Sequence, residues 1–392
     1  MSQDPVVITA ARRTPLGAFQ GVLSPASATD LSAAVSRQCT MDAGVAAQDV
    51  SEVILGCVLP AGLGQAPARQ ASLASGLPKD VPCTTINKVC GSGMKAAMFA
   101  HDLIAAGSAD IVLAGGMESM SNAPYLLPKA RAGYRMGHQQ VLDHMFFDGL
   151  QNPYDGNMMG HFAELTADRY GFTREQQDEF AIASVTRARN AMADGRFDDE
   201  IVSVTVKTRK GEQEVTADEG PTAAQIEKIP TLRPAFRKDG TVTAASSSSI
   251  SDGAASLLLM RRSEAISRGA PVLATMTGHT GFAQEPEWFT TSPVFAIKAL
   301  LERRDWSVSD IDLFEVNEAF ACVTMAAMHD VGIAHDKINV HGGACALGHP
   351  IGASGARILV TLIHALRARG GGRGIASLCI GGGEAVAVGV EV

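Results

Sequence analysis

The stretch ASLCIGG at residues 376–382 is the strongest indication of the fold, because it repeats a pattern found much earlier in the chain. Its apolar run ends in glycines, as does IVLAGG at 111–116. Each run follows a helical stretch that opens on small residues, GSG at 91–93 and ASG at 353–355. This repeat predicts two similar βαβ-rich halves packed about a pseudo-twofold axis. Chance similarity of glycine-rich segments is the alternative.

Secondary-structure signals elsewhere favour an α/β protein. Short β-branched runs alternate with alanine-rich helical stretches, as in layered α/β folds. These segments lie at 6–9, 30–43, 53–58, 92–106 and 111–114. The segment between the halves has a different sequence pattern. TREQ at 173–176 is a capping box that opens a helix to about residue 193, and 201–206 is a predicted strand.

These signals divide the chain into three parts. We expect an N-terminal half at 1–118, an inserted loop domain at 119–249 and a C-terminal half at 271–392, with 250–270 returning to the first half. The site should lie where the matching glycine-rich strand ends converge.

Composition excludes several classes of protein. With 46% hydrophobic and 19% charged residues in 392, the chain has material for large buried layers and is not disordered. A formal charge of −8 argues against nucleic acid or an acidic membrane surface as the main partner. The seven cysteines form no Cys-x-x-Cys pair, and no run reaches the roughly 18–20 apolar residues of a membrane span. We expect a cytoplasmic protein that binds neither nucleic acid nor membrane.

Cys90 lies between a β-run and a helix, in VCGSG at 89–93. A thiol at a helix N-terminus meets the positive end of the helix dipole and free N–H groups, so we expect its pKa to fall below the ordinary value of about 8.5. The thiolate is the nucleophilic form. Cys90 is therefore a candidate nucleophile, and a packed structural cysteine is the alternative.

His349 and Asn317 are candidates to assist that nucleophile. His349 stands among glycines in GHPIG at 348–352, and an imidazole with an ordinary pKa near 6.5 can take a proton from a thiol. Asn317 follows a strand at 311–314, where a neutral amide can hold a water or donate to an oxyanion. A structural histidine and an asparagine helix cap are the competing interpretations.

Cys379 lies just before a run of three glycines, in CIGGG at 379–383. Glycines let a ligand come close to the backbone amides beside the sulfur, although a buried structural cysteine is the simpler interpretation. Two cysteines, a histidine, an asparagine and glycines at matching strand ends predict covalent acyl transfer joined to proton abstraction. No metal-ligand spacing, P-loop or dinucleotide fingerprint competes, so we expect no metal.

The chain resembles the thiolases along essentially its full length. NEAF at 317–320, GHPIG at 348–352 and CIGGG at 379–383 are similar to that family's three C-terminal motifs in order and spacing, and VCGSG at 89–93 to its nucleophile motif. The resemblance implies a layered αβαβα core with an inserted loop domain. It also implies a ping-pong reaction of acyl-CoA thioesters without a cofactor.

The resemblance implies roles for the site residues. Cys90 attacks the thioester with His349 as its base, and Cys379 moves the proton at the α-carbon of acetyl-CoA. His349 and a water held by Asn317 form one oxyanion hole. The backbone N–H groups of Cys90 and Gly381 form the other.

Substrate-binding positions follow from the same resemblance, with some departures. The expected residues are Met158, Met159, Ser248, Ala319 and Phe320. Ser248 matches the family's pantetheine-contacting serine, although Ser246 stands where asparagine is common. MMG at 158–160 replaces the usual His-Met-Gly of acetoacetyl-CoA-forming thiolases, and this apolar change suits a longer or branched acyl group. GPTA at 220–223 lacks the arginine with which several relatives hold the CoA nucleotide.

SMSNAPY at 119–125 and the loop lengths favour the acetoacetyl-CoA type. We therefore expect reversible Claisen condensation of two acetyl-CoA to acetoacetyl-CoA and CoA. A broader-chain, degradative 3-ketoacyl-CoA thiolase is the first alternative. A decarboxylating ketosynthase-like enzyme, which does not need Cys379, and a non-catalytic CoA-binding protein are more distant. The resemblance also implies a homotetramer, a dimer of dimers bridged by the loop at 124–143.

Overall fold

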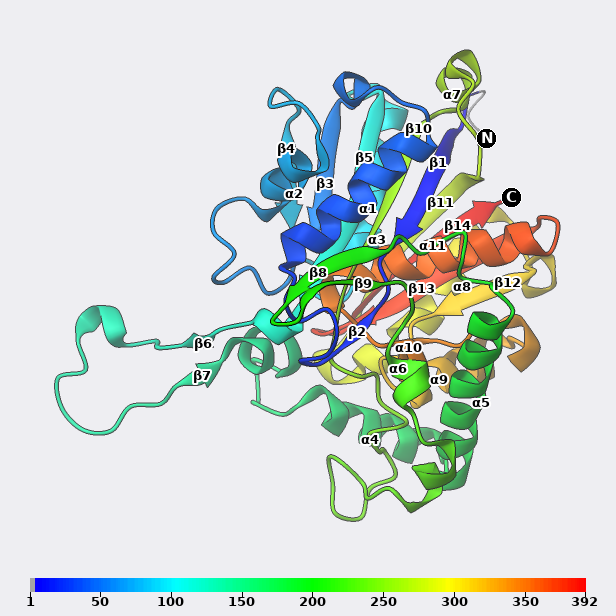
Figure 1. The fold of residues 1–392 in the computed structure, drawn as a ribbon. Coiled ribbons are helices and arrows are strands. Elements are labelled where there is room, and N and C mark those ends of the chain that lie inside the picture. Colours follow the sequence, from blue (N-terminus) through cyan, green and yellow to red (C-terminus); the bar gives the residue numbers. More distant parts are fainter. Residues whose placement is uncertain (1–3) are drawn as a thin grey trace.

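The computed structural model describes residues 4–392, and it builds them around one mixed sheet (Figure 1). Its strands are β1 (Val6–Arg13), β2 (Gly17–Ala18), β3 (Glu52–Gly56), β4 (Cys83–Ile86), β5 (Ile111–Ser119), β10 (Ser251–Arg261), β11 (Ala274–Ala283), β12 (Leu313–Val316), β13 (Arg373–Ile380) and β14 (Glu384–Glu391). The strand order is β12-β13-β14-β11-β1-β10-β5-β3-β4, with β2 paired to β10 beside this path. β3 runs parallel to β4 and β5, and β12 parallel to β13, so each half contains a parallel unit.

Helices cover both faces of each half. They are α1 (Ala28–Asp42), α2 (Pro67–Ser75), α3 (Ser92–Ala106), α7 (Arg262–Arg268), α8 (Ser292–Arg304), α9 (Ala321–Val331), α10 (Ala344–Leu347) and α11 (Ile351–Ala368). One buried apolar cluster joins α1 and α2 to the first half of the sheet, and another joins α8 and α9 to the second. A third surrounds α3 and α11, which contact strands of both halves. The layers are therefore, in order, α1 with α2, the first half of the sheet, α3 with α11, the second half of the sheet, and α8 with α9. This is the αβαβα core that the resemblance implies.

The two copies of the sequence repeat occupy matching places in this core. Helix α3 leads into β5, and α11 leads into β13. The two helices cross closely because each has a glycine at the point of contact. A Cβ on Gly355 would lie 2.5 Å from the backbone nitrogen of Met94, and a Cβ on Gly93 would lie 2.8 Å from that of Ala356. The small residues of the repeat therefore set the distance between the two helix N-termini.

The segment between the halves contains β6 (Tyr125–Leu126), β7 (Leu142–Asp143), α4 (Met159–Tyr170), α5 (Arg174–Ala193), β8 (Val204–Thr208), β9 (Gly211–Val215) and α6 (Gly220–Ala223). The predicted helix to about residue 193 is confirmed as α5, and Thr173 caps it by accepting the Gln176 N–H. The predicted strand at 201–206 is displaced. Ile201 forms an isolated bridge with Arg13 at the end of β1, and β8 begins only at Val204.

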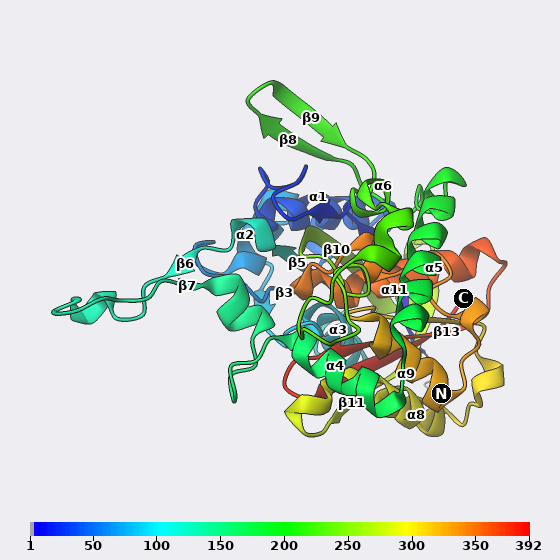
Figure 2. The ribbon, with the colours of Figure 1, turned by 90° about the horizontal axis from the view of Figure 1, so that it is seen from below.

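Two features of this segment project from the body of the molecule: the arm that carries β6 and β7, and the β8–β9 hairpin (Figure 2). Strand β10 returns after the segment to lie between β1 and β5. The domain boundaries drawn from the sequence stay a prediction.

Helix α11 is the one helix within residues 4–392 whose length and apolar composition suit a membrane span. Of its residues, 83% are buried inside the fold. In this structure it is a central core helix.

Candidate active site

Cys90 sits on a strained turn between β4 and α3. Val89 has a φ of 47°, in the left-handed region that a β-branched residue rarely adopts. The Ser92 hydroxyl donates to the Val89 carbonyl at 2.7 Å and so stabilises the turn. A Cβ on Gly91 would lie 2.5 Å from the end of the Ile380 side chain. Glycine here lets the Cys90 turn pack directly against the segment that follows Cys379.

The Cys90 thiol faces two backbone donors, the N–H groups of Gly381 and of Cys90 itself. Burial nevertheless raises the pKa of Cys90 to about 11, because it outweighs the lowering by these N–H groups. The depressed pKa expected from the helix N-terminus is therefore wrong. At neutral pH the resting residue is a thiol, and a base must remove its proton as it reacts.

His349 lies two residues before α11 and is oriented by that helix. The Ser354 hydroxyl donates to the Pro350 carbonyl at 2.9 Å and also meets Nδ1 of His349. Because the hydroxyl proton is engaged by Pro350, Nδ1 of His349 is the donor to Ser354, which leaves the lone pair on Nε2. Burial, with the nearby charge of Arg357, lowers the pKa of His349 to about 3. The imidazole is thus neutral and able to accept a proton.

Asn317 follows β12, and its Nδ2 lies 3.4 Å from Nε2 of His349. It does not cap α9, since that helix begins at Ala321 with Phe320 at the N-cap and no side-chain cap. The Asn317 backbone N–H donates to the Ser377 carbonyl of β13 at 3.0 Å. Its Oδ1 is buried without a hydrogen-bond partner among residues 4–392. A buried carbonyl of this kind is a position that an ordered water can satisfy.

Cys379 is fully buried near the end of β13, opposite Ala385 of β14. Burial raises the pKa of its thiol well above the ordinary value, with further contributions from Cys90 and Cys322. The contribution of Cys90 to the pKa of Cys379 indicates that the two thiols lie near one another. Cys379 lines neither of the two cavities described next.

Two cavities meet at His349. One, of about 60 Å³, is lined by Val89, Cys90, Gly149, Leu150, Met159, Ser248, Phe289, Ala319, Phe320, His349, Ile351 and Gly381. The other, of about 190 Å³, shares several of these residues and adds Met158, with mainly apolar neighbours. The backbone N–H of Ser248 donates to the Ala319 carbonyl at 3.0 Å, which joins the serine stretch to the NEAF motif. The structure thus gathers the predicted substrate-binding residues around Cys90 and His349.

Sequence reasoning missed Glu118, which joins the two halves beside the site. Buried at the end of β5, its carboxylate accepts the backbone N–H groups of Val58 at 3.0 Å, Leu59 at 3.1 Å and Gly352 at 2.9 Å. It thereby ties the loop after β3 to the first turn of α11. Burial raises the pKa of Glu118 to about 7. The available signal was a single charged residue just after the apolar run at 111–117.

Glu318, inside the NEAF motif, has a similar supporting position. It accepts hydrogen bonds from the Ser184 hydroxyl at 2.7 Å, from Nδ2 of Asn339 at 2.8 Å and from the Cys345 backbone at 3.1 Å. These contacts order the chain that leads to His349. The Glu118 and Glu318 carboxylates therefore both help to position α11 and His349.

The family is shown by the comparison of the whole chain with known proteins. Residues 6–263 match the thiolase N-terminal domain and residues 270–392 match the thiolase C-terminal domain. The chain belongs to the thiolase family. The predicted resemblance and α/β fold class are confirmed, and so is the expectation of an acyltransferase enzyme.

Individual relatives are similar over almost the entire length. The acetyl-CoA acetyltransferase of Pseudomonas aeruginosa is 48% identical over 98% of each chain, and that of Cupriavidus necator is 48% identical over 98% of this chain and 99% of its own. The crystal structure of the Bacillus anthracis acetyl-CoA acetyltransferase superposes with a TM-score of 0.97 at 43% identity, covering 99% of this chain and 98% of that one. A thiolase from Ascaris suum in complex with coenzyme A gives a TM-score of 0.94 at 41% identity, covering 99% of both chains.

Proposed function

We propose that this protein is an acetyl-CoA C-acetyltransferase, which reversibly joins two acetyl-CoA into acetoacetyl-CoA and CoA. The observation that carries the proposal is the convergence of the Cys90 thiol, the Gly381 N–H and neutral His349 at one small cavity. Full-length relatives that bear the name acetyl-CoA acetyltransferase support the substrate.

In the first half-reaction Cys90 becomes acylated. Nε2 of His349 takes the thiol proton as the Cys90 sulfur attacks the thioester carbonyl of acetyl-CoA. The negative charge that develops on the carbonyl oxygen is stabilised by the N–H groups of Cys90 and Gly381, and each such donor contributes about 3 kcal/mol. The carbon–sulfur bond to CoA then breaks, and the departing CoA sulfur takes the thiol proton of Cys379, while His349 keeps the Cys90 proton on Nε2.

In the second half-reaction the Cys379 thiolate, formed when Cys379 gave its proton to the departing CoA, removes the α-proton of a second acetyl-CoA. Its raised pKa makes the thiolate a stronger base for this weakly acidic proton. His349 and a water held at Asn317 Oδ1 stabilise the enolate oxygen. The enolate carbon attacks the acyl group on Cys90, the bond to Cys90 breaks, and the Cys90 sulfur takes back the proton from Nε2 of His349. Cys379 keeps the α-proton, so both cysteines end the cycle as thiols.

The acyl and pantetheine groups occupy the two cavities. Ser248 is placed to meet the pantetheine, and Met158, Met159, Ala319 and Phe320 shape the space around the acyl group. No cofactor is needed, since thiols, imidazole and backbone amides supply every proton and charge contact described.

A broader-chain 3-ketoacyl-CoA thiolase is the second candidate. One specific observation favours it: the larger cavity, about 190 Å³, has apolar walls that include Met120, Phe146, Met158 and Phe236. Thiolysis rates across a series of 3-ketoacyl-CoA chain lengths separate the candidates. A maximum at acetoacetyl-CoA supports the first, and a maximum at longer chains supports the second.

A homotetramer built from dimers is part of the proposal. The arm that carries β6 and β7 projects from the body (Figure 2). It bears exposed apolar side chains, including Tyr125, Leu127, Met136 and Val141. We expect light scattering to give a tetramer mass for the intact chain and a dimer mass when the arm is shortened. A monomeric or dimeric intact chain would contradict this assembly.

The cytoplasm is the proposed location. All seven cysteines, each of which lies within residues 4–392, are free thiols. This usage suits a reducing compartment. Fractionation of the source cells, with the protein followed by antibody, tests the assignment.

Two cysteine variants test the reaction scheme. Cys90→Ala should take up no acetyl group from acetyl-CoA and lose turnover. Cys379→Ala should still gain one acetyl group by mass spectrometry and lose exchange of the acetyl α-protons with deuterated water. The matched control is Cys83→Ala, which removes a partly buried thiol outside both cavities. An acetylated Cys90→Ala protein, or normal proton exchange in Cys379→Ala, would show that the assigned roles are wrong.

A further inference from the structure

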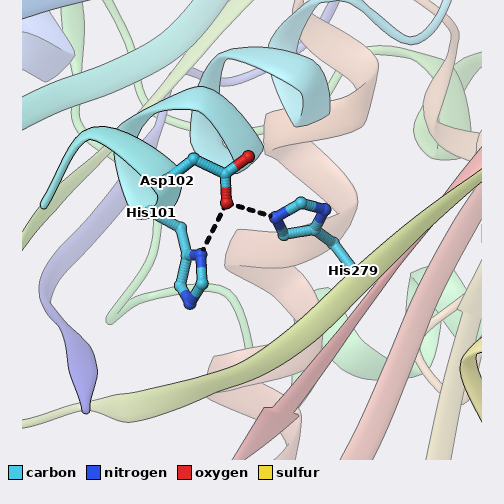
Figure 3. A group of neighbouring side chains, drawn as sticks. All are labelled: His101, Asp102 and His279. Carbon is cyan, nitrogen blue, oxygen red and sulfur yellow. Dashed lines mark hydrogen bonds and ion pairs between the residues drawn. The ribbon is translucent and has the colours of Figure 1, made fainter. Parts of the chain in front are cut away.

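Two histidines and an aspartate meet at the far end of α3, away from both active-site cavities (Figure 3). His101 and Asp102 are neighbours near the C-terminal end of that helix, and His279 comes from β11. At 1.5 Å per residue, Asp102 lies roughly 15 Å along the helix from its start at Ser92. The cluster is therefore a separate feature that the proposed reaction does not use.

The three side chains converge on one oxygen atom. Asp102 Oδ1 lies 3.1 Å from Nδ1 of His101 and 2.8 Å from Nε2 of His279. One ligand atom from each residue falls within 4.8 Å of the others. The imidazole rings meet edge to face at 5.3 Å, and the second nitrogen of each ring points away from Asp102 (Figure 3). Two imidazoles and a carboxylate form a donor set that suits Zn²⁺.

The two histidines of the cluster are mostly buried, whereas its aspartate is open to solvent. The histidine side chains are only 22% and 16% exposed, for His101 and His279, whereas Asp102 is 54% exposed. The backbone of His279 is fixed further, because its carbonyl accepts a hydrogen bond from Arg303 of α8 at 2.8 Å. The ligands thus stand on a helix and a strand, as a precise site requires, and solvent can reach the carboxylate.

The cluster offers a metal ion two imidazoles and one carboxylate. Neutral imidazole and carboxylate are the metal-binding forms. Lys95, earlier on α3, is a nearby positive charge that weakens the attraction.

We propose that His101, Asp102 and His279 bind one divalent transition cation of the Zn²⁺ class, with water completing its coordination. Bonds of about 2.0–2.1 Å place tetrahedral ligands roughly 3.4 Å apart, so the ligand atoms need to move by only about an ångström. The two ring protons that face Asp102 shift to the outward nitrogens, so that each ring stays neutral. The ion then links α3 of the first half to β11 of the second and stabilises the folded chain.

Titration of chelator-treated protein tests this site. Zn²⁺ binding, measured by calorimetry, should give one ion per chain with a dissociation constant on the order of micromolar, and the ion should raise the unfolding temperature. Co²⁺ provides the spectroscopic test because the seven free thiols are competing ligands. Nitrogen and oxygen ligands give weak visible bands without the ultraviolet thiolate-to-cobalt charge transfer.

Variants assign the ion to its ligands. His279→Ala should weaken Zn²⁺ binding at least tenfold and abolish the rise in unfolding temperature. Asp102→Asn, a milder change at the most exposed ligand, should weaken binding in a chain that folds normally. The matched control is His329→Ala, which removes an exposed histidine that also pairs with a neighbouring aspartate. No binding by the intact chain, equal binding by Asp102→Asn and the control, or a thiolate charge-transfer band would overturn the proposal.

Discussion

The two halves place different chemistry at matching points of one scaffold (Figure 1). In the first half Cys90 precedes the core helix α3, and β5 ends beside the anchoring carboxylate Glu118. In the second half His349 precedes α11, and β13 ends at Cys379 and Ile380. The repeat therefore supplies geometry, and the side chains at its equivalent positions supply separate roles.

The difference also lies in how each half holds its reactive residue. Cys90 stands on a turn with a left-handed valine, whereas His349 is oriented by a hydroxyl of the helix that follows it. Burial then acts on both in opposite directions, raising the pKa of the thiol and lowering that of the imidazole. Both groups are neutral at rest, so the thiol should react only when the base is in place.

Removing His349, the base supplied by the second half, should have the largest effect on the reaction of Cys90. His349→Ala should slow acylation of Cys90 about 10³-fold, because among residues 4–392 His349 is the histidine that lines the cavity and can accept the thiol proton. Single-turnover acetylation, followed by mass spectrometry, measures the effect. His329→Ala, far more exposed, is the control. An acylation rate within a few-fold of the unmodified chain would show that Cys90 does not depend on His349.

The pH dependence of Cys90 alkylation tests whether burial raises the pKa of the thiol. Because the pKa is raised to about 11, the thiolate fraction at pH 7 is roughly 300-fold below that of an ordinary cysteine with a pKa of about 8.5. Alkylation by iodoacetamide should therefore keep rising with pH beyond 9. The rate is measured on the Cys90 peptide by mass spectrometry, with free cysteine as reference. A midpoint below 8.5 would mean that the helix N-terminus outweighs burial after all.

The smallest expected effect concerns the crossing of the two core helices. Gly355→Ala places a Cβ 2.5 Å from the Met94 backbone nitrogen, and overpacking of this kind costs about 1–3 kcal/mol of unfolding free energy. Gly281→Ala is the control, since the nearest atom to its new Cβ would be 3.9 Å away. Denaturant unfolding compares the two. Equal midpoints would show that the helices can separate without cost.

Much of the fold was predictable because it depends on local patterns. The repeated glycine-ended runs at 111–116 and 376–382 predicted the two halves, and the family match confirms the fold class. The capping box at 173–176 predicted α5 because its hydrogen bonds lie within one turn. The strand predicted at 201–206 was displaced, because the bridge between Ile201 and Arg13 joins residues far apart in the chain.

Four motifs pointed to the candidate site, and the structure gathers their residues, whose roles stay a proposal. The motifs did not predict which distant residues would surround these side chains in the fold. Glu118 contacts loops that are distant in sequence, and the burial that sets the pKa of Cys90 exists only once both halves close around it. The His101, Asp102 and His279 cluster has no recognisable spacing, because β11 and α3 meet only in the fold.

Periodicity and short motifs in the sequence were enough to predict the duplicated α/β fold, the family and the residue types available for acyl transfer. The protonation of Cys90 and His349, the anchoring by Glu118 and the meeting of His101, Asp102 and His279 became visible only in the folded chain. Desolvation, charge proximity and side-chain convergence depend on distances between residues that the chain order keeps far apart.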